Sequence, residues 1–285
     1  MHERDSDATA RPLILPAMNN AKLSTAQAAA DPLASATATV VALRRDTARE
    51  LAAMAAVVAA IAWMLIAVAG LGIDYGVKAL LCFALGAWLV WRGLPFHPHA
   101  RFGPANRVTL ARLALMALIA ALVGEALPRP PLSAESPALW WLIVVATVTA
   151  LLDAVDGALA RRSGLASAFG ARFDMETDAA FTIVLCALVL QTGQAGPWVL
   201  ACGLMRYAFV AAARAWPWLN APLAPSKRRQ SVCVIQITTL IVCLGPIVAP
   251  WLANALAALS LALLTTSFAV DVRTLAQQRL PLQET

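Results

Sequence analysis

Apolar runs of about 20 residues, separated by short turns rich in glycine, proline and arginine, recur along most of the 285-residue chain. Each run matches the hydrocarbon core of a bilayer, which is about 30 Å thick, because an α-helix rises about 1.5 Å per residue. Charged residues make up 13% of the sequence, whereas soluble domains carry about 25%. The sequence therefore predicts an all-α, polytopic membrane helix bundle. Its expected spans are residues 50–70, 77–95, 108–127, 137–157, 175–193, 197–215, 231–248 and 251–270.

Basic residues lie mainly in alternate loops between these runs. The N-terminal tail and every second loop contain Arg44, Arg45, Arg49, Arg92, Arg101, Arg107, Arg161, Arg162, Arg172, Lys227, Arg228, Arg229, Arg273 and Arg279. The opposite loops contain only Lys78 and Arg129. Because cytoplasmic loops of membrane proteins are enriched in Lys and Arg, both termini are expected in the cytoplasm and the chain in the inner (cytoplasmic) membrane.

Two other functional classes are disfavoured by composition. The net charge of +6 does not indicate a nucleic-acid partner, because the basic residues form no patch with interleaved aromatic residues. The cysteines lie within apolar runs and include no C-x-x-C pair, which argues against a disulfide framework or a zinc site.

A cluster of carboxylates interrupts the apolar pattern between Asp153 and Asp178. On a helix, one stripe would be formed by Asp153, Asp156, Gly157, Ala160 and Arg161. After a short loop, a second stripe would be formed by Gly170, Asp174 and Asp178. Carboxylates beside a bilayer are costly and mark functional sites. Opposed in a helical hairpin, these would form an all-oxygen cage suited to Mg²⁺ or Mn²⁺.

These residues resemble the signature of the CDP-alcohol phosphotransferase family, D-x2-D-G-x2-A-R-x8-G-x3-D-x3-D. Every fixed position is met, by Asp153, Asp156, Gly157, Ala160, Arg161, Gly170, Asp174 and Asp178. The alternative is a hairpin whose acids only pair with neighbouring arginines. Such structural pairs need neither the glycines nor the fixed spacing, so the motif favours the family.

The resemblance implies a site that holds a CDP-linked donor and two divalent metal ions, Mg²⁺ or Mn²⁺. Asp153, Asp156 and Asp174 are the expected metal ligands. Asp178 would add an oxygen and, by the resemblance, take the acceptor hydroxyl proton as the catalytic base. The hairpin residues expected to bind the nucleotide are Gly157, Ala160, Arg161 and Gly170.

A second motif opens the run that begins near residue 108. Asn106, Thr109 and Arg112 resemble the N-x-x-T-x-x-R at the start of the family's first core helix, which implies a role in the nucleotide site. A helix cap with an interfacial arginine is the alternative for these three residues.

Acceptor binding is expected from cations after the hairpin. Arg206 and Arg214 lie in R-x7-R-x-W, which resembles the glycerophosphate-accepting branch of the family, although Tyr207 replaces the glutamate that commonly follows the first arginine. Lys227 and Arg229 follow in S-K-R-R-Q, which would equally suit a basic cluster touching anionic lipid. Together these cations favour a phosphorylated polyol as acceptor.

Four further polar residues have simpler interpretations. His97 and His99 are expected to be an interfacial loop pair and not metal ligands. Glu176 points about 200° away from Asp174 on a helix and is interpreted as a structural partner for an arginine. Asp271 is assigned to a solvated helix end.

The predicted organisation has four parts. Residues 1–45 form a disordered or weakly helical cytoplasmic tail, and residues 46–100 a transmembrane helix pair with its linker. Residues 101–275 form the six-helix catalytic core that the family implies, and residues 276–285 a second tail. A stretch of small residues suits close helix packing and a homodimer face, and it comprises Ala117, Ala120, Ala121 and Gly124.

The predicted function is phosphatidyl transfer from CDP-diacylglycerol to a polar alcohol with release of CMP, in phospholipid biosynthesis. The same motif also serves transfer from CDP-choline or CDP-ethanolamine to diacylglycerol. A divalent-cation transporter is the alternative from another class. Transport sites lie near the bilayer midplane at interrupted helices, whereas these acids lie at helix ends.

Overall fold

The computed structural model describes residues 18–127, 137–163, 167–224 and 226–279. These residues form α-helices and short 3₁₀ helices, with no strand among them. The α-helices are α1 (Met18–Ala69), α2 (Ile73–Gly93), α3 (Pro104–Ala120), α4 (Pro137–Ser163), α5 (Ala168–Gln191), α6 (Leu200–Ala215), α7 (Lys227–Cys243) and α8 (Pro250–Arg279). The 3₁₀ helices are η1 (Leu94–Phe96), η2 (Pro197–Val199) and η3 (Pro217–Asn220).

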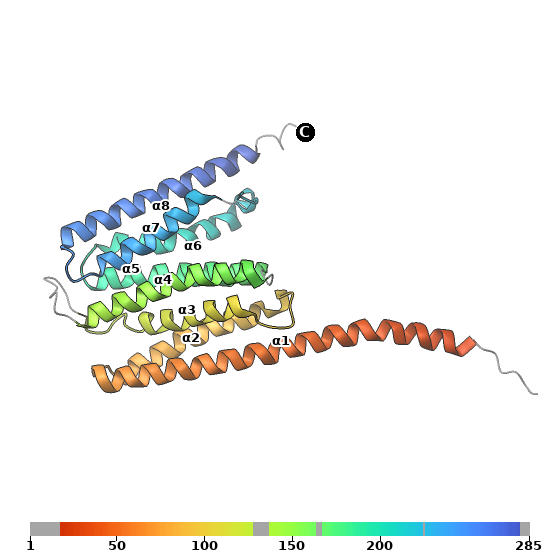
Figure 1. Ribbon diagram of the computed structural model, residues 1–285. Helices are drawn as coiled ribbons and strands as arrows, with labels where there is room; N and C mark the ends of the chain where they lie inside the picture. The colour runs from red at the N-terminus through yellow and green to blue at the C-terminus, as the bar shows by residue number, and fades with distance from the viewer. Residues whose placement is uncertain (1–17, 128–136, 164–166, 225, 280–285) are drawn as a thin grey trace, which may run out of the picture.

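Successive helices run antiparallel, so alternate connections meet at the same end of the bundle (Figure 1). One end gathers the starts of α3, α5 and α7 and the last turns of α4, α6 and α8. The cations expected on the cytoplasmic side by the loop pattern therefore share this end, together with the start of the carboxylate hairpin.

The protein is a multi-pass membrane protein. Five described helical segments are long and apolar enough to cross a bilayer, and they lie in α1, α2, α4, α6 and α8. Large apolar side chains on these helices face outward, as with Trp63 and Trp251, which are 72% and 73% exposed. The polytopic all-α bundle predicted from the sequence is confirmed.

The other three expected spans are helices that are too short or too charged to qualify as spans by themselves. α3 and α7 contain 17 residues each. α5 contains 24 residues, but its first half carries Asp174, Glu176 and Asp178. Each of these three helices packs against several others. α3 contacts α1, α2, α4 and α5, whereas α5 contacts α3, α6 and α7, and α7 contacts α4, α5 and α8.

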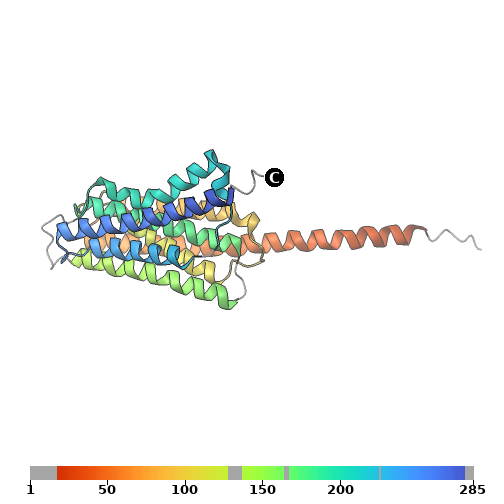
Figure 2. The same ribbon diagram turned by 90° about the horizontal axis from the view of Figure 1, so that it is seen from above.

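The N-terminal segment contains a long helix, because α1 begins at Met18 and contains 52 residues. At about 1.5 Å per residue it is about 78 Å long, more than twice a bilayer core. Its first half extends well past the bundle (Figures 1 and 2). Alanine is abundant in this segment and has the highest helix propensity, which favours its helical form.

The first two helices pack against α3 and its neighbouring linker. Asp46 of α1 accepts a hydrogen bond from the backbone N–H of Phe102 at 3.0 Å, and Glu50 pairs with Arg107 at 2.7 Å. On α2, the Tyr75 hydroxyl donates to the carbonyl of Leu118 at 3.0 Å. The N-terminal pair is therefore tied to both ends of α3 by polar contacts as well as by packing.

The small-residue stretch of α3 is used inside the chain. Ala117 and Ala121 are fully buried against neighbouring helices, so this stretch does not offer the homodimer face expected from the sequence. Gly124 follows with a φ of 88°, where it supports the turn out of α3. The homodimer stays a prediction without an assigned surface.

Candidate active site

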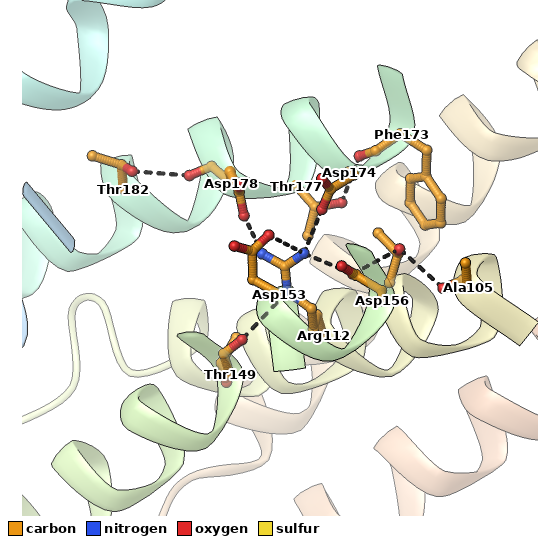
Figure 3. A network of polar contacts seen from close by, with 11 residues as sticks. Ala105, Arg112, Thr149, Asp153, Asp156, Phe173, Asp174, Thr177, Asp178 and Thr182 are labelled. Atoms are coloured by element: carbon orange, nitrogen blue, oxygen red, sulfur yellow. Dashed lines mark hydrogen bonds and ion pairs between the residues drawn. The ribbon is translucent and has the colours of Figure 1, made fainter. Parts of the chain in front are cut away.

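The guanidinium of Arg112 lies among four carboxylates at the end of the bundle where α4 and α5 meet (Figure 3). Its Nη1 donates to Asp156 at 2.9 Å and to Asp174 at 2.5 Å, and lies 3.1 Å from Asp153. Its Nη2 donates to Asp178. Arg112 is 1% exposed, and a charge so deeply buried requires carboxylate partners.

Three helices position this network. α4 contributes Asp153 and Asp156, which are three residues apart and share a face, and α5 contributes Asp174 and Asp178 in the same way. α3 lies beneath both and contributes Arg112. Its Thr109 also donates to Asp156 at 3.0 Å, and Arg112 Nε donates to the carbonyl of Thr149 at 3.3 Å.

The carboxylates fit a divalent cation. Oxygen atoms of Asp153, Asp156 and Asp174 lie within 4.8 Å of one another, and hard cations such as Mg²⁺ and Mn²⁺ prefer this donor type. With all four carboxylates ionised, one guanidinium leaves a formal charge of −3, since −4 + 1 = −3. The position of Arg112 itself shows that the arrangement attracts a cation.

A cavity of about 210 Å³ opens beside the acids, between α3, α4 and the start of α5. All but one of the residues predicted to bind the nucleotide line it, namely Asn106, Thr109, Gly157, Ala160, Arg161 and Gly170. Asp156 and Asp174 form its wall toward the carboxylates. Motifs that are about 50 residues apart in the sequence therefore meet at one cavity.

Gly170 is required at the start of α5. A Cβ on Gly170 would lie 2.8 Å from Asn106 Oδ1, closer than a side chain tolerates. Its backbone N–H also donates to the Ser167 hydroxyl at 3.0 Å, which caps α5. At Gly157 the nearest atom to such a Cβ is the flexible end of Arg161 at 3.4 Å, so the helix there remains open to the cavity.

Arg112 is the exception to the predicted nucleotide site, because its side chain does not line this cavity. It points into the carboxylates, where it pairs with the residues expected to ligate metal. Asn106 and Arg112 are six residues apart, which is a rotation of about 600° along the helix. Their side chains therefore point about 120° away from each other.

A larger cavity of about 420 Å³ lies on the other side of α5, between α5, α6, α7 and α8. Asp178 lines it, as do the side chains of Arg206, Arg229 and Asp271. Much of the remaining wall is apolar, with Phe209 and Phe268 in edge contact at a ring distance of 5.6 Å.

The expected acceptor cations divide into two groups. Arg206 and Arg229 line the larger cavity, whereas Arg214 and Lys227 are exposed and line neither cavity. Arg206 pairs with Glu176 at 2.7 Å, which confirms the interpretation of Glu176 as a partner for an arginine.

Asp271 is 7% exposed, so its assignment to a solvated helix end is wrong. It accepts from Arg228 at 2.5 Å and from Arg229 at 3.3 Å, and Asp271 and Arg229 both line the larger cavity. The packing of α8 against α7 brings Asp271 to these two arginines, and the spacing of residues along the sequence does not indicate that contact.

Comparison with protein families matches residues 103–268 to the CDP-alcohol phosphatidyltransferase family. No curated protein and no solved structure gave a significant match. The match covers more than half of the chain and includes both motifs, the whole carboxylate cluster, the smaller cavity and the lining of the larger cavity except Asp271. The chain therefore belongs to the CDP-alcohol phosphatidyltransferase family.

Proposed function

We propose that this protein transfers a phosphatidyl group from CDP-diacylglycerol to a polar alcohol and releases CMP, as a step of phospholipid synthesis. The supporting observation is that one carboxylate cluster borders two cavities. The smaller is lined by the motif residues Asn106, Gly157 and Gly170, and the larger is mostly apolar and carries Arg206 and Arg229.

The donor nucleotide is assigned to the smaller cavity. Gly157 leaves the α4 side of this cavity without a side chain, so a nucleotide can approach the helix backbone there, and Gly170 makes room for Asn106, which also lines the cavity. Arg161 lines the same cavity and can hold a phosphate by charge-assisted hydrogen bonds. Asp156 and Asp174 connect this cavity to the metal ligands.

Asp153, Asp156, Asp174 and Asp178 are the residues proposed to hold two Mg²⁺ or Mn²⁺ ions. Bound there, divalent ions neutralise the donor diphosphate and stabilise the leaving phosphate.

The transfer itself exchanges one phosphorus–oxygen bond for another. The acceptor hydroxyl oxygen bonds to the phosphatidyl phosphorus, and the bond from that phosphorus to the bridging oxygen breaks, so CMP leaves with the electron pair. Asp178 is proposed to take the hydroxyl proton. It alone of the four acids lines the larger cavity, to which the acceptor is assigned.

The catalytic end is proposed to face the cytoplasm of a bacterial-type inner membrane, with both termini on that side. The basic residues of the loops at this end favour that orientation. Water-soluble CMP and the alcohol would then exchange with the cytoplasm, while the lipid stays in the bilayer.

Two other activities fit less well. Transfer from CDP-choline or CDP-ethanolamine to diacylglycerol would need no cations beside the acceptor, whereas Arg206 and Arg229 lie there. A cation carrier would need its acids near the bilayer midplane. Such sites also form at interrupted helices, whereas Asp153 and Asp156 lie in the unbroken second half of α4, and Asp174 and Asp178 in the unbroken first half of α5.

The function is tested by incubating the purified protein with CDP-diacylglycerol, Mn²⁺ and a panel of alcohols, and then identifying the lipid product by mass. We expect CMP and a new phospholipid in equal amounts. If Mn²⁺-dependent lipid formation occurred with CDP-choline and diacylglycerol but not with CDP-diacylglycerol, the activity would instead be transfer from a CDP-linked alcohol to diacylglycerol. Mg²⁺ flux into vesicles without any CDP-alcohol turnover would establish the carrier.

Asp178→Asn is expected to lower turnover by at least about 100-fold while it changes donor binding by only a few-fold, because the base acts on the acceptor proton. CDP binding and CMP release measured on the same preparation check this split. An equal loss of both would make Asp178 mainly a metal ligand. Arg172→Gln removes a charge at an exposed position of the same helix that lines neither cavity, so it is the matched control and should keep both.

The acceptor is proposed to be a phosphorylated polyol, with glycerol 3-phosphate ahead of inositol phosphate. Arg206 Nε is buried and has no hydrogen-bond partner among the described residues, so it is available to a phosphate. Arg229, on α7, lines the same cavity.

Arg229→Ala is therefore expected to raise the acceptor KM about tenfold or more, because a charge-assisted hydrogen bond is lost, with donor KM nearly unchanged. Arg214→Ala removes the same charge outside the cavity and should change neither constant by more than about twofold. Initial rates against acceptor concentration check both. Turnover only with unphosphorylated alcohols would refute the acceptor proposal and leave the phosphatidyl transfer standing.

A further inference from the structure

His97 lies in the linker between α2 and α3, just outside the part of the chain that matches the family. Its ring contacts Phe169 edge-on, with ring centres 5.1 Å apart. Phe169 directly precedes Gly170, which lines the nucleotide cavity. The ring of Phe169 also packs closely on Gly93, since a Cβ added to Gly93 would lie 2.7 Å from that ring. The linker is therefore packed directly behind the start of α5.

The other contact of His97 leads to α3. Its Nε2 lies 3.2 Å from Asn106 Nδ2, and its Nδ1 lies 3.1 Å from the carbonyl oxygen of His99. The backbone N–H of His99 also lies 3.2 Å from Nδ1, so this nitrogen has both a donor and an acceptor beside it. Of the two neutral tautomers, only the one protonated at Nδ1 leaves Nε2 free to accept from Asn106 Nδ2, which the carbonyl of Phe102 holds on this side. Nδ1–H then donates to the carbonyl of His99, and Nε2 accepts from the amide of Asn106. Burial lowers the pKa of His97, which favours this neutral form.

This contact fixes which way the Asn106 amide faces. Its Nδ2 donates to His97 and also to the carbonyl of Phe102 at 2.5 Å, so both amide protons are used. Its Oδ1 lies on the other side, toward Gly170, where the two residues line the same cavity. Asn106 is 7% exposed, so a rotated amide would lose both bonds without gaining water.

We propose that His97 is a positioning residue for the donor nucleotide, since it holds the Asn106 oxygen as a hydrogen-bond acceptor facing the cavity. The group recognised there is an N–H or O–H donor of the nucleotide, such as a base amino group or a ribose hydroxyl. The assignment of a nucleotide rests on the proposed function. The N-terminal addition thereby contributes to donor affinity, although it lies outside the matched region.

The experiment compares CDP binding, in the presence of Mn²⁺, by the full-length protein and its variants. His97→Phe keeps the ring and its contact with Phe169 but cannot accept from Asn106. We expect the dissociation constant to rise about five- to tenfold, as for loss of one hydrogen bond. His97→Gln offers an acceptor oxygen and should restore most of the affinity. His99→Phe is the control, because its Nε2 has no partner among the described residues.

A double-mutant cycle separates positioning from general packing. If His97 acts through Asn106, then His97→Phe should cost no further affinity in an Asn106→Ala background. Additive losses would overturn the proposal, and so would CDP binding by His97→Phe equal to that of the wild type. Should His97→Phe not fold, His97→Asn, which is polar but too short to reach Asn106, replaces it with the same expected loss.

The readout also distinguishes this inference from the proposed function. Wild-type protein that binds CDP but releases no CMP from CDP-diacylglycerol would refute phosphatidyl transfer, and the binding comparison would still decide the role of His97. Wild-type protein that is active but shows no difference between His97→Phe and His99→Phe would refute the role of His97 alone.

Discussion

Asp153→Asn, Asp156→Asn and Asp174→Asn are each expected to reduce CMP release by at least about 100-fold. Their oxygen atoms lie within 4.8 Å of one another, so all three can contact the same metal ion. The loss of one carboxylate charge should therefore lower the affinity of the site for that ion. The measurement is CMP release at increasing Mn²⁺. Residual activity should appear only at higher metal concentration than in the wild type.

Asp74→Asn is the matched control for these variants. Asp74 lies at the opposite end of the bundle, and its side chain is 71% exposed beside Lys78 at 3.6 Å. Such a surface pair contributes little, so activity and metal dependence should stay unchanged. Near-normal turnover with wild-type metal dependence in any of the three cluster variants would remove that residue from the site.

Arg112→Met is expected to destabilise the metal-free protein by about 3–5 kcal/mol, because four carboxylates are left without their buried counter-charge. Divalent cations can replace that charge, so Mn²⁺ should recover more stability in the variant than in the wild type. Thermal unfolding in detergent with and without Mn²⁺ measures both effects.

Arg162→Met removes an arginine at the exposed end of α4 and serves as the comparison. It should unfold like the wild type with or without metal. The account of the cluster fails if Arg112→Met is as stable as Arg162→Met in the absence of metal, or if Mn²⁺ stabilises the two variants equally.

The hairpin could be predicted from the sequence because local spacing determines it. Asp153 and Asp156 lie three residues apart and Asp174 and Asp178 four apart, so each pair must share a helix face wherever the helices lie. The glycines and Arg161 follow the same rule. This is why the nucleotide cavity contains the residues that the motif indicated.

The contacts that the sequence did not reveal are those made by packing between distant helices. Arg112 was grouped with Asn106 by its motif, but its side chain pairs with carboxylates of α4 and α5 beside the nucleotide cavity and does not line that cavity. Asp271 was assigned to a solvated helix end, because its contact with Arg228 depends on the packing of α8 against α7. His97 shows the same limit, since its partner Asn106 and its neighbour Phe169 come from two different helices.

The two cavities share no lining residue, although α5 contributes to both. Asp174 faces one and Asp178 the other, one helical turn apart. Donor and acceptor assigned to these cavities can therefore be present together in a ternary complex. The proposed transfer is therefore expected to be a single displacement between them, with no covalent enzyme intermediate and with inversion of configuration at the transferred phosphorus.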